Sequence, residues 1–288
     1  MKITETTNSR GNKDICIDFD GIMDMRQYVL DGTRGKDYYV SSKGGRSFFE
    51  SESIEEADNL LVHGWELGRT ELTAKVDNLS RSVEEMVGYR RDVTGIFFDV
   101  GSVVSGEPEC WFEPELEEKR NSIKVVLNGI TSSGISTTAI QNRGAAIVCL
   151  LDTLQRAGWA IELEVCCKSY RPFGSAKRNK DHILSRVPIG CSPLDLDSLA
   201  FTLAHPSFPR RFMYSVHDVW SGTCCHRAGC HGSPTDLTPE EIGENVMYFG
   251  SVGWDQYGNG LDQFGTMEKA TAWLRKKLEE LTGEKQEG

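Results

Sequence analysis

The chain has 288 residues, 39% hydrophobic and 26% charged, which excludes wholesale disorder and is enough to bury a sizeable core. Its formal net charge of −11 makes nucleic acid an unlikely partner, because phosphate contacts need Lys and Arg. No stretch reaches the roughly 18 apolar residues of a membrane helix, and residues 1–8 lack the apolar segment of a signal peptide. Nine cysteines, some within apolar runs as at Cys149 and Cys166, favour free thiols and a cytoplasmic location.

The first part of the chain divides into two segments by composition. Residues 1–45 are polar and glycine-rich, which predicts a loosely attached arm with one strand near residues 14–19. Residues 46–92 are predicted to be a helical segment. Its first helix begins at Ser53, with Glu56 completing a capping box, and a second apolar pattern of helical spacing starts at Trp65.

Residues 93–281 are expected to form one α/β core domain, followed by a charged tail over 282–288. A β-branched strand at 123–128, a Ser/Thr-rich loop, a helix over 139–157 and a strand at 159–167 predict a right-handed parallel βαβ unit. A strand near 245–252 and a final helix over 267–281 complete the pattern. The predicted fold is therefore α/β, with a doubly wound, mostly parallel, Rossmann-like sheet preceded by the N-terminal helical segment.

The loop of this βαβ unit suggests a metal or ligand site. The unit resembles the start of a von Willebrand factor A-type domain, whose first loop binds a divalent metal through an Asp-x-Ser-x-Ser pattern. Here the matching residues run Asn128-Gly129-Ile130-Thr131-Ser132, with Asn in place of Asp and Ile in place of the middle Ser. The resemblance implies a von Willebrand A-like core with a degenerate metal-ion site. It marks Asn128, Thr131, Ser132 and Ser133 as binding candidates.

A second resemblance covers most of the chain, from about residue 48 to 281. It rests on the following sequences: residues 53–68, which contain Gly64-Trp65-Glu66-Leu67-Gly68; Phe98-Asp99-Val100-Gly101 with Ser105-Gly106-Glu107-Pro108-Glu109-Cys110; Arg143-Gly144-Ala145-Ala146; and Ala204-His205-Pro206-Ser207-Phe208-Pro209-Arg210-Arg211. Their order and spacing are similar to those of uncharacterised proteins encoded by bacteriophages and bacterial mobile elements. The resemblance implies such an origin, and hence the host cytoplasm, but it supplies no activity.

A cysteine- and histidine-rich loop is the sharpest local signal for a metal. Thiolate and imidazole are good zinc ligands, and four of them close a tetrahedral site. The spacing fits no standard zinc finger, so a further ligand such as Cys191 or His217 would be needed. Zinc or another divalent metal and an incidental surface loop both remain open. The candidate ligands are Cys224, Cys225, His226, Cys230 and His231.

Four further side chains could carry catalysis. Glu107 and Glu109 flank Pro108 and could act as general acid and base or hold a cation. His205 and Arg210 lie in a cluster with Arg211, whose forked donors suit phosphate or carboxylate. The alternative is structural, with one arginine bridging to Glu107 or Glu109 across the fold.

Two loops could bind a ligand or partner. The loop after residue 128 lies where open α/β sheets bind ligands, at the carboxyl end of a parallel strand, but the chain has no nucleotide-binding glycine motif. Trp254 and Tyr257, in a glycine-rich loop, are typical of recognition or of a turn whose rings plug the core.

Three functions follow from these patterns. The first is a non-catalytic binding protein that engages a protein of the host or phage. The second is a hydrolase-like enzyme acting on a phosphate-bearing substrate with Glu107, Glu109, His205 and Arg210. The third is a structural protein of a virion or its assembly. The degenerate metal loop and the absence of a nucleophile triad or nucleotide motif favour the first.

Overall fold

The computed structural model describes residues 1–7, 11–36, 45–84, 89–93, 97–114, 122–132, 134–156, 159–173, 179–190, 199–221, 233–252 and 263–282. These residues form an α/β fold with one large mixed sheet and one small outlying sheet. The strands of the large sheet are β1 (Lys2–Thr7), β2 (Lys13–Asp18), β6 (Ser122–Asn128), β7 (Ala160–Phe173), β8 (Asn179–Ile189), β9 (Ser233–Pro234) and β10 (Val246–Phe249).

The predicted βαβ unit lies at the centre of the large sheet. β6 is joined through α6 (Thr137–Arg156) to β7, and the two strands pair in parallel, with Ile123 opposite Ile161 and Asn128 opposite Cys166. β10 adds in parallel on the other side of β6. The βαβ prediction is therefore confirmed, and the three strands bring their carboxyl ends to one edge.

The rest of the sheet differs from the prediction. Its strand order is β1-β2-β8-β7-β6-β10, with β9 also pairing β7. β7 and β8 form a long antiparallel hairpin, β2 lies parallel to β8, and β1 pairs antiparallel with β2. The sheet is thus mixed rather than mostly parallel, because β7 returns directly as a hairpin instead of crossing over through a helix. The predicted von Willebrand A-like sheet is therefore not observed beyond the parallel βαβ unit on which that resemblance was based.

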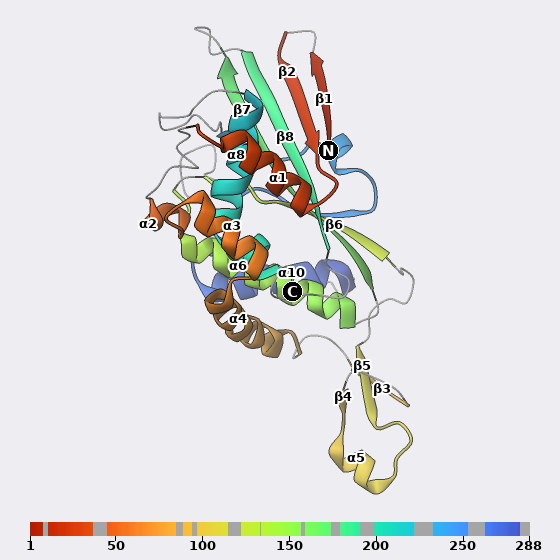
Figure 1. The fold of residues 1–288 in the computed structure, drawn as a ribbon. Coiled ribbons are helices and arrows are strands. Elements are labelled where there is room, and N and C mark those ends of the chain that lie inside the picture. Colours follow the sequence, from red (N-terminus) through yellow and green to blue (C-terminus); the bar gives the residue numbers. More distant parts are fainter. Residues whose placement is uncertain are drawn as a thin grey trace.

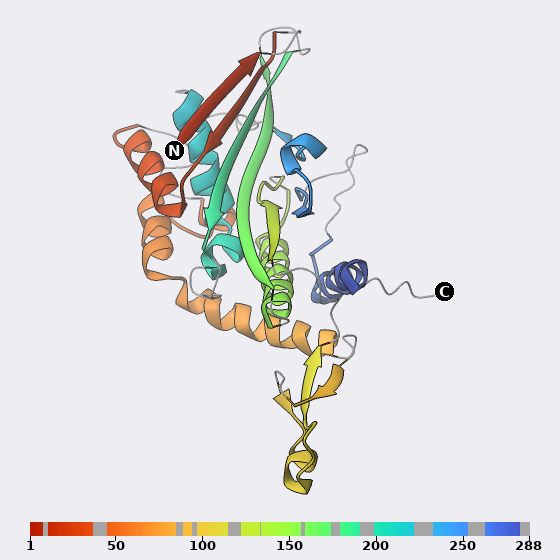
Figure 2. The same ribbon diagram turned by 90° about the vertical axis from the view of Figure 1, so that its right-hand side faces the viewer.

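Most of the described helices belong to one hydrophobic cluster with a single face of the large sheet (Figures 1 and 2). That face is built from alternate strand residues such as Ile17, Val125, Val165 and Val187. The helices that join it are α1 (Ile22–Thr33), α2 (Arg46–Phe49), α3 (Ile54–His63), α4 (Glu66–Glu84), α6, the π-helices η1 (Ala200–Ala204) and η2 (Phe208–Met213), α8 (Tyr214–Ser221) and α10 (Met267–Thr282).

The opposite face of the sheet carries charged residues and little helix. In the described part of the chain it is covered by Leu237 and α9 (Pro239–Ile242), which pack on a small cluster that includes Val126 and Cys166. Beside this cluster Glu164 accepts ion pairs from Lys124 at 3.0 Å and from Arg186 at 2.6 Å. A second helical layer on this face would bury its charged side chains, which costs free energy. The doubly wound arrangement predicted from the sequence is accordingly not the one observed in the described residues.

The N-terminal residues are part of the core. Residues 1–45, which the sequence predicts to be a loose arm, contribute β1, β2 and α1. Ile15 and Ile17 of β2 are 2% and 0% exposed, and β2 pairs with β8. Two buried side chains in a short polar strand give a weak periodic signal, which accounts for the difference.

The second sheet belongs to an outlying module, defined as residues 89–114. It comprises β3 (Tyr89–Asp92), β4 (Phe97–Phe98), the short helix α5 (Val100–Ser105) and β5 (Trp111–Pro114), with β5 pairing antiparallel to both β3 and β4. Both views show the module projecting away from the large sheet, with α5 at its far end (Figures 1 and 2).

Close packing of α6 against η1 depends on Gly144. A Cβ atom at this position would lie 2.6 Å from the Ala204 Cβ atom and 2.6 Å from the Leu203 carbonyl oxygen. The Gly-Ala-Ala sequence of α6 therefore lets the π-helical segment lie directly on the central helix.

We expect Gly144→Val to lower the free energy of unfolding by about 3 kcal/mol, because overpacking against backbone forces the two helices apart. Chemical denaturation measures the change. The matched control is Gly190→Val, since a Cβ atom at Gly190 meets nothing within 4 Å. Equal stability of the two variants would contradict the close approach.

Candidate functional site

His205 is a buried ring of the core. It is 2% exposed, its Nδ1 atom accepts a hydrogen bond from the Ser207 amide at 3.1 Å, and its ring lies between Phe201 and Trp65. Burial lowers the pKa of His205 to about 4. A neutral, enclosed imidazole with aromatic neighbours connects η1 to the start of α4 and is not placed to meet a substrate.

Arg210 is equally enclosed, at 1% exposed. Its guanidinium donates to the carbonyl oxygens of Phe48, at 2.7 Å, and Ile135, and lies 4.1 Å from the centre of the Phe48 ring. Desolvation lowers the pKa of Arg210. The side chain thus holds α2 and the loop before α6 together through its two Nη atoms, while its buried Nε atom has no hydrogen-bond partner among the described residues.

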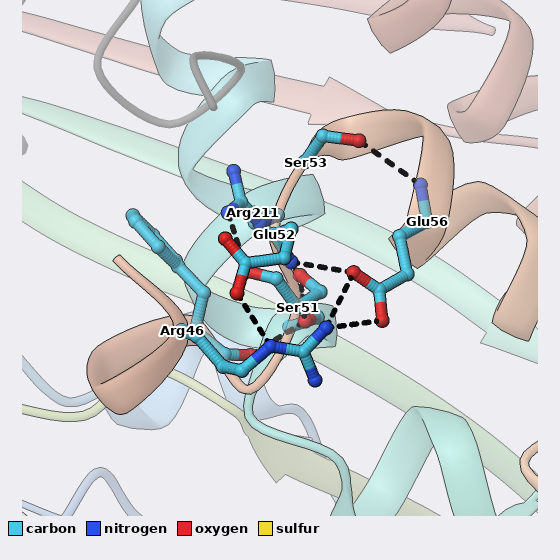
Figure 3. A network of polar contacts seen from close by, with 8 residues as sticks. Arg46, Ser51, Glu52, Ser53, Glu56 and Arg211 are labelled. Carbon is cyan, nitrogen blue, oxygen red and sulfur yellow. Dashed lines mark hydrogen bonds and ion pairs between the residues drawn. The ribbon is translucent and has the colours of Figure 1, made fainter. Parts of the chain in front are cut away.

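Arg211 forms hydrogen bonds with the turn between α2 and α3. Its Nε atom donates to Ser51 Oγ and its Nη2 atom to the Ser51 carbonyl oxygen, both at 2.7 Å (Figure 3). Ser51 leads into α3, where Ser53 Oγ accepts from the Glu56 amide, so the predicted N-cap is confirmed. The Glu56 carboxylate accepts from the Glu52 amide instead of the Ser53 amide, so the predicted capping box is only half formed. On the outside of this turn Arg46 pairs with Glu52 and Glu56. Arg210 and Arg211 together therefore bind residues 48–51 to η2.

Glu107 and Glu109 lie in the outlying module instead. Arg91 of β3 pairs with Glu107 at 3.0 Å and with Asp99 at 3.2 Å. The ion pair considered between a core arginine and Glu107 is thus replaced by one within the module. Glu109 is exposed. His205, Arg210 and Arg211 lie in the helical layer, whereas both glutamates belong to the outlying module, which projects away from the large sheet (Figure 1). The structure therefore does not bring the glutamates to these three residues.

The carboxyl edge of β6 and β10 is filled by the protein's own polar groups. Asn128 is 0% exposed; its Nδ2 atom donates to the Thr235 carbonyl oxygen at 2.9 Å and to Tyr248 Oη at 3.3 Å, and its Oδ1 atom accepts from the Ile130 amide. Tyr248 Oη in turn donates to Asp236 at 3.1 Å. Asn128 therefore works as a turn-forming amide in place of a metal-binding carboxylate.

Of the predicted binding residues in this loop, Thr131 is buried and Ser132 is paired through its backbone. Ser132 donates its amide to the Val252 carbonyl oxygen at 2.9 Å. Thr131 is 2% exposed, and its Oγ1 atom has no partner among the described residues. It lines a cavity of about 20 Å³ with mostly apolar walls, including Ile135, Phe208 and Val252. That space admits about one water molecule and no nucleotide, sugar or phosphate group.

Arg143 is the member of this edge that sequence reasoning missed as a site residue. It is 6% exposed and donates to the carbonyl oxygens of Asn128, at 3.0 Å, and Gly250, so it joins the ends of β6 and β10. Desolvation lowers the pKa of Arg143 to about 10. Arg143 stands at helical spacing from Ile140 and Ile147, on the buried face of α6. This spacing is the feature of the sequence that indicates its burial.

Several predicted site residues lie outside the described part of the chain. They are Ser133, Cys224, Cys225, His226, Cys230, His231, Trp254 and Tyr257. Among the described residues no group of three or more His, Cys, Asp and Glu is placed to hold a metal ion. Zinc, or another divalent metal, at the Cys/His loop stays a prediction, as does recognition by the two aromatic residues.

An apolar stripe on α5 was not anticipated from the sequence. Val100, Val103 and Val104 are 65%, 45% and 82% exposed, and Val93 in the same module is 59% exposed. Residues three and four apart share one side of a helix, so the three valines of α5 form one face. Exposed apolar residues that gather on a projecting element are typical of protein interaction surfaces.

Comparison with known proteins identifies a family whose function is unknown. Residues 4–274 match a family described as a domain of unknown function (DUF7192). The chain belongs to this family. No curated protein matches the DUF7192 chain significantly. No solved structure matches it significantly either.

Nothing in the described part of the DUF7192 chain is a candidate membrane span, because none of the helices there is both long and apolar enough to cross a bilayer. Cys149 and Cys166 are buried and form no disulfide, as the sequence predicts, and burial raises the pKa of the Cys166 thiol to about 12. Such a thiol is a packing group and a poor nucleophile.

Burial of His205 predicts a pH dependence of stability. The folded-state pKa of about 4 lies below the unfolded value of 6.5, so the unfolded chain binds the extra proton between these values. Stability contributed by the neutral ring is complete above pH 6.5 and is lost as the pH falls towards 4, in total about 3 kcal/mol. We expect His205→Gln, which cannot titrate, to remove this part of the slope. Denaturation curves of both proteins across the range measure it, and an unchanged slope would show that His205 is accessible to protons in the folded state.

Proposed function

We propose that this DUF7192 protein is a non-catalytic binding protein that engages a protein partner of the host or phage through the outlying module. The proposal rests above all on the exposed valine face of α5, which sits at the end of the module farthest from the large sheet (Figure 2). The bacteriophage or mobile-element origin implied by the resemblance suggests where the partner is found.

The environments of the candidate catalytic residues support binding over hydrolysis. A general acid or base must reach the proton that it transfers, and an anion-binding arginine must present free donors to solvent. His205 and Arg210 are 2% and 1% exposed, and Arg210 donates to backbone oxygens. Glu107 is held by Arg91 in another part of the molecule.

The filled carboxyl edge of the sheet gives a second, independent argument. Open α/β sheets that bind small ligands keep a crevice at this edge. Here Asn128, Arg143 and Tyr248 are engaged with one another's backbone or side chains, and the neighbouring cavity is about 20 Å³. The residues at this edge therefore stabilise the fold, and we place the recognition surface on the outlying module instead.

We expect Val104→Asp, alone or with Val100→Asp, to abolish partner binding while the fold is retained, because a buried interface carboxylate without a counter-charge is costly. The affinity-tagged chain is expressed in the cells that carry its gene, and the proteins recovered with wild type and variant are quantified by mass spectrometry. Recovery of the specific partner should fall by about tenfold or more.

Leu67→Asp is the matched control. Leu67 is 80% exposed, close to the 82% of Val104, but it lies on α4, outside the module. The control should recover the partner as wild type does. If all three proteins recover the same set in equal amounts, the module is not the docking element and the proposal fails.

A further inference from the structure

We infer that the partner presents an apolar groove with a basic rim, into which α5 inserts its valine face. This inference rests on the proposed function and adds the chemistry of the bound surface. It is carried by three properties of the module, namely the spacing of its valines, the sign of the charges around them and the rigidity of the helix.

The spacing of the valines fits insertion into a groove. Val100, Val103 and Val104 stand at positions i, i+3 and i+4 of one short helix. Helix-in-groove recognition uses anchors at these intervals, because they make a continuous apolar line on one side. Ser102 points the other way, since it is 5% exposed and donates to Asp99. The apolar side of α5 is therefore the outward one.

The charges around the valines are mainly negative. Asp99 precedes α5, Glu107 follows it, and Glu109 lies two residues further on; Glu109 is exposed, and the first two share one arginine. Residues 89–114 contain the acidic residues Asp92, Asp99, Glu107, Glu109 and Glu113 against the basic residues Arg90 and Arg91. A rim of Lys or Arg on the partner complements this edge and speeds association.

The same sign disfavours two other occupants. A second copy of the chain would place its acidic module against an identical one, in a protein whose net charge is already −11. An anionic lipid surface would meet acidic side chains where polybasic segments normally bind. Charge complementarity therefore selects a basic protein surface.

The helix is held in shape before any partner arrives. Asp99 caps α5 by accepting from the Gly101 amide at 2.9 Å, and hydrogen bonds from Ser102 and Gly101 lower the pKa of Asp99. Arg91 bridges Asp99, before the first turn, and Glu107, after the last. Both ends of α5 are thus tied to β3, so docking costs little ordering entropy.

Synthetic amphipathic helical peptides test the inference on the intact chain, because their apolar face stands in for the floor of the groove and their flanking charges stand in for its rim. The probes are a leucine–lysine peptide, a leucine–glutamate peptide and a serine–lysine peptide of equal length, measured by fluorescence anisotropy at low and high salt. We expect the leucine–lysine peptide to bind about tenfold more tightly than the other two, and to weaken as salt rises. Val104→Asp should abolish this binding.

Glu109→Lys isolates the charge. We expect it to weaken the leucine–lysine peptide by about threefold, as one exposed charge does, and to leave the fold intact. Glu244→Lys is the matched control, because Glu244 is exposed and lies in the turn between α9 and β10. An equal effect of the two reversals would mean that overall charge, and not the module, attracts the peptide, and would overturn the inference.

The remaining outcomes separate this inference from the proposed function. Equal binding of the leucine–glutamate peptide, with capture from cells still dependent on Val104, overturns the basic rim alone. Binding of the leucine–lysine peptide that survives Val104→Asp overturns insertion of α5. A dimer in size-exclusion chromatography that Val104→Asp dissociates would show that a second copy occupies the face. Loss of Val104 dependence in the capture experiment removes the proposed function as well.

Discussion

The buried guanidinium groups of Arg143, Arg210 and Arg211 join segments of this DUF7192 protein that are far apart in sequence. Each donates to backbone carbonyl oxygens of another segment, respectively at the ends of β6 and β10, at α2 and the loop before α6, and at Ser51. A buried carbonyl oxygen that lacks a hydrogen-bond donor destabilises the fold by about 1–3 kcal/mol. Each arginine removes this penalty only while the segments that it contacts keep their observed positions. The helical layer over the sheet depends on these contacts.

This use of arginine explains why the residues looked catalytic from the sequence. His205, Arg210 and Arg211 have the functional groups of an anion site, and sequence carries no direct record of burial. Aromatic faces complete the environment, since Arg210 and Arg211 each lie 4.1 Å from the centre of a phenylalanine ring, that of Phe48 and Phe49. Cation–π contact and backbone acceptors together let the core hold positive charge.

The sequence was informative where a long periodic pattern is reinforced by local signals. The apolar stripe of α6 between two β-branched strands predicted β6, α6 and β7, and Ser53 marked the start of α3. It also indicated β2, through the strand predicted near residues 14–19, but it missed β1 and α1 and gave no sign that β2 pairs with β8 in the core. Of the candidate site residues, Asn128 was singled out by the resemblance to a von Willebrand A-type loop, and in the structure its amide holds a turn. The exposed face of α5 was missed because three valines in a short segment also fit a buried strand.

The antiparallel pairing within the outlying module has an evolutionary consequence. Tyr89 and Pro114, the first residue of β3 and the last of β5, lie opposite each other, so the segment leaves and re-enters at neighbouring points. Insertions, deletions or replacement of the intervening residues change the separation of those points little. The fold can therefore exchange this segment by recombination while its core stays as it is, and under the proposed function such an exchange changes what is recognised without changing how the chain folds.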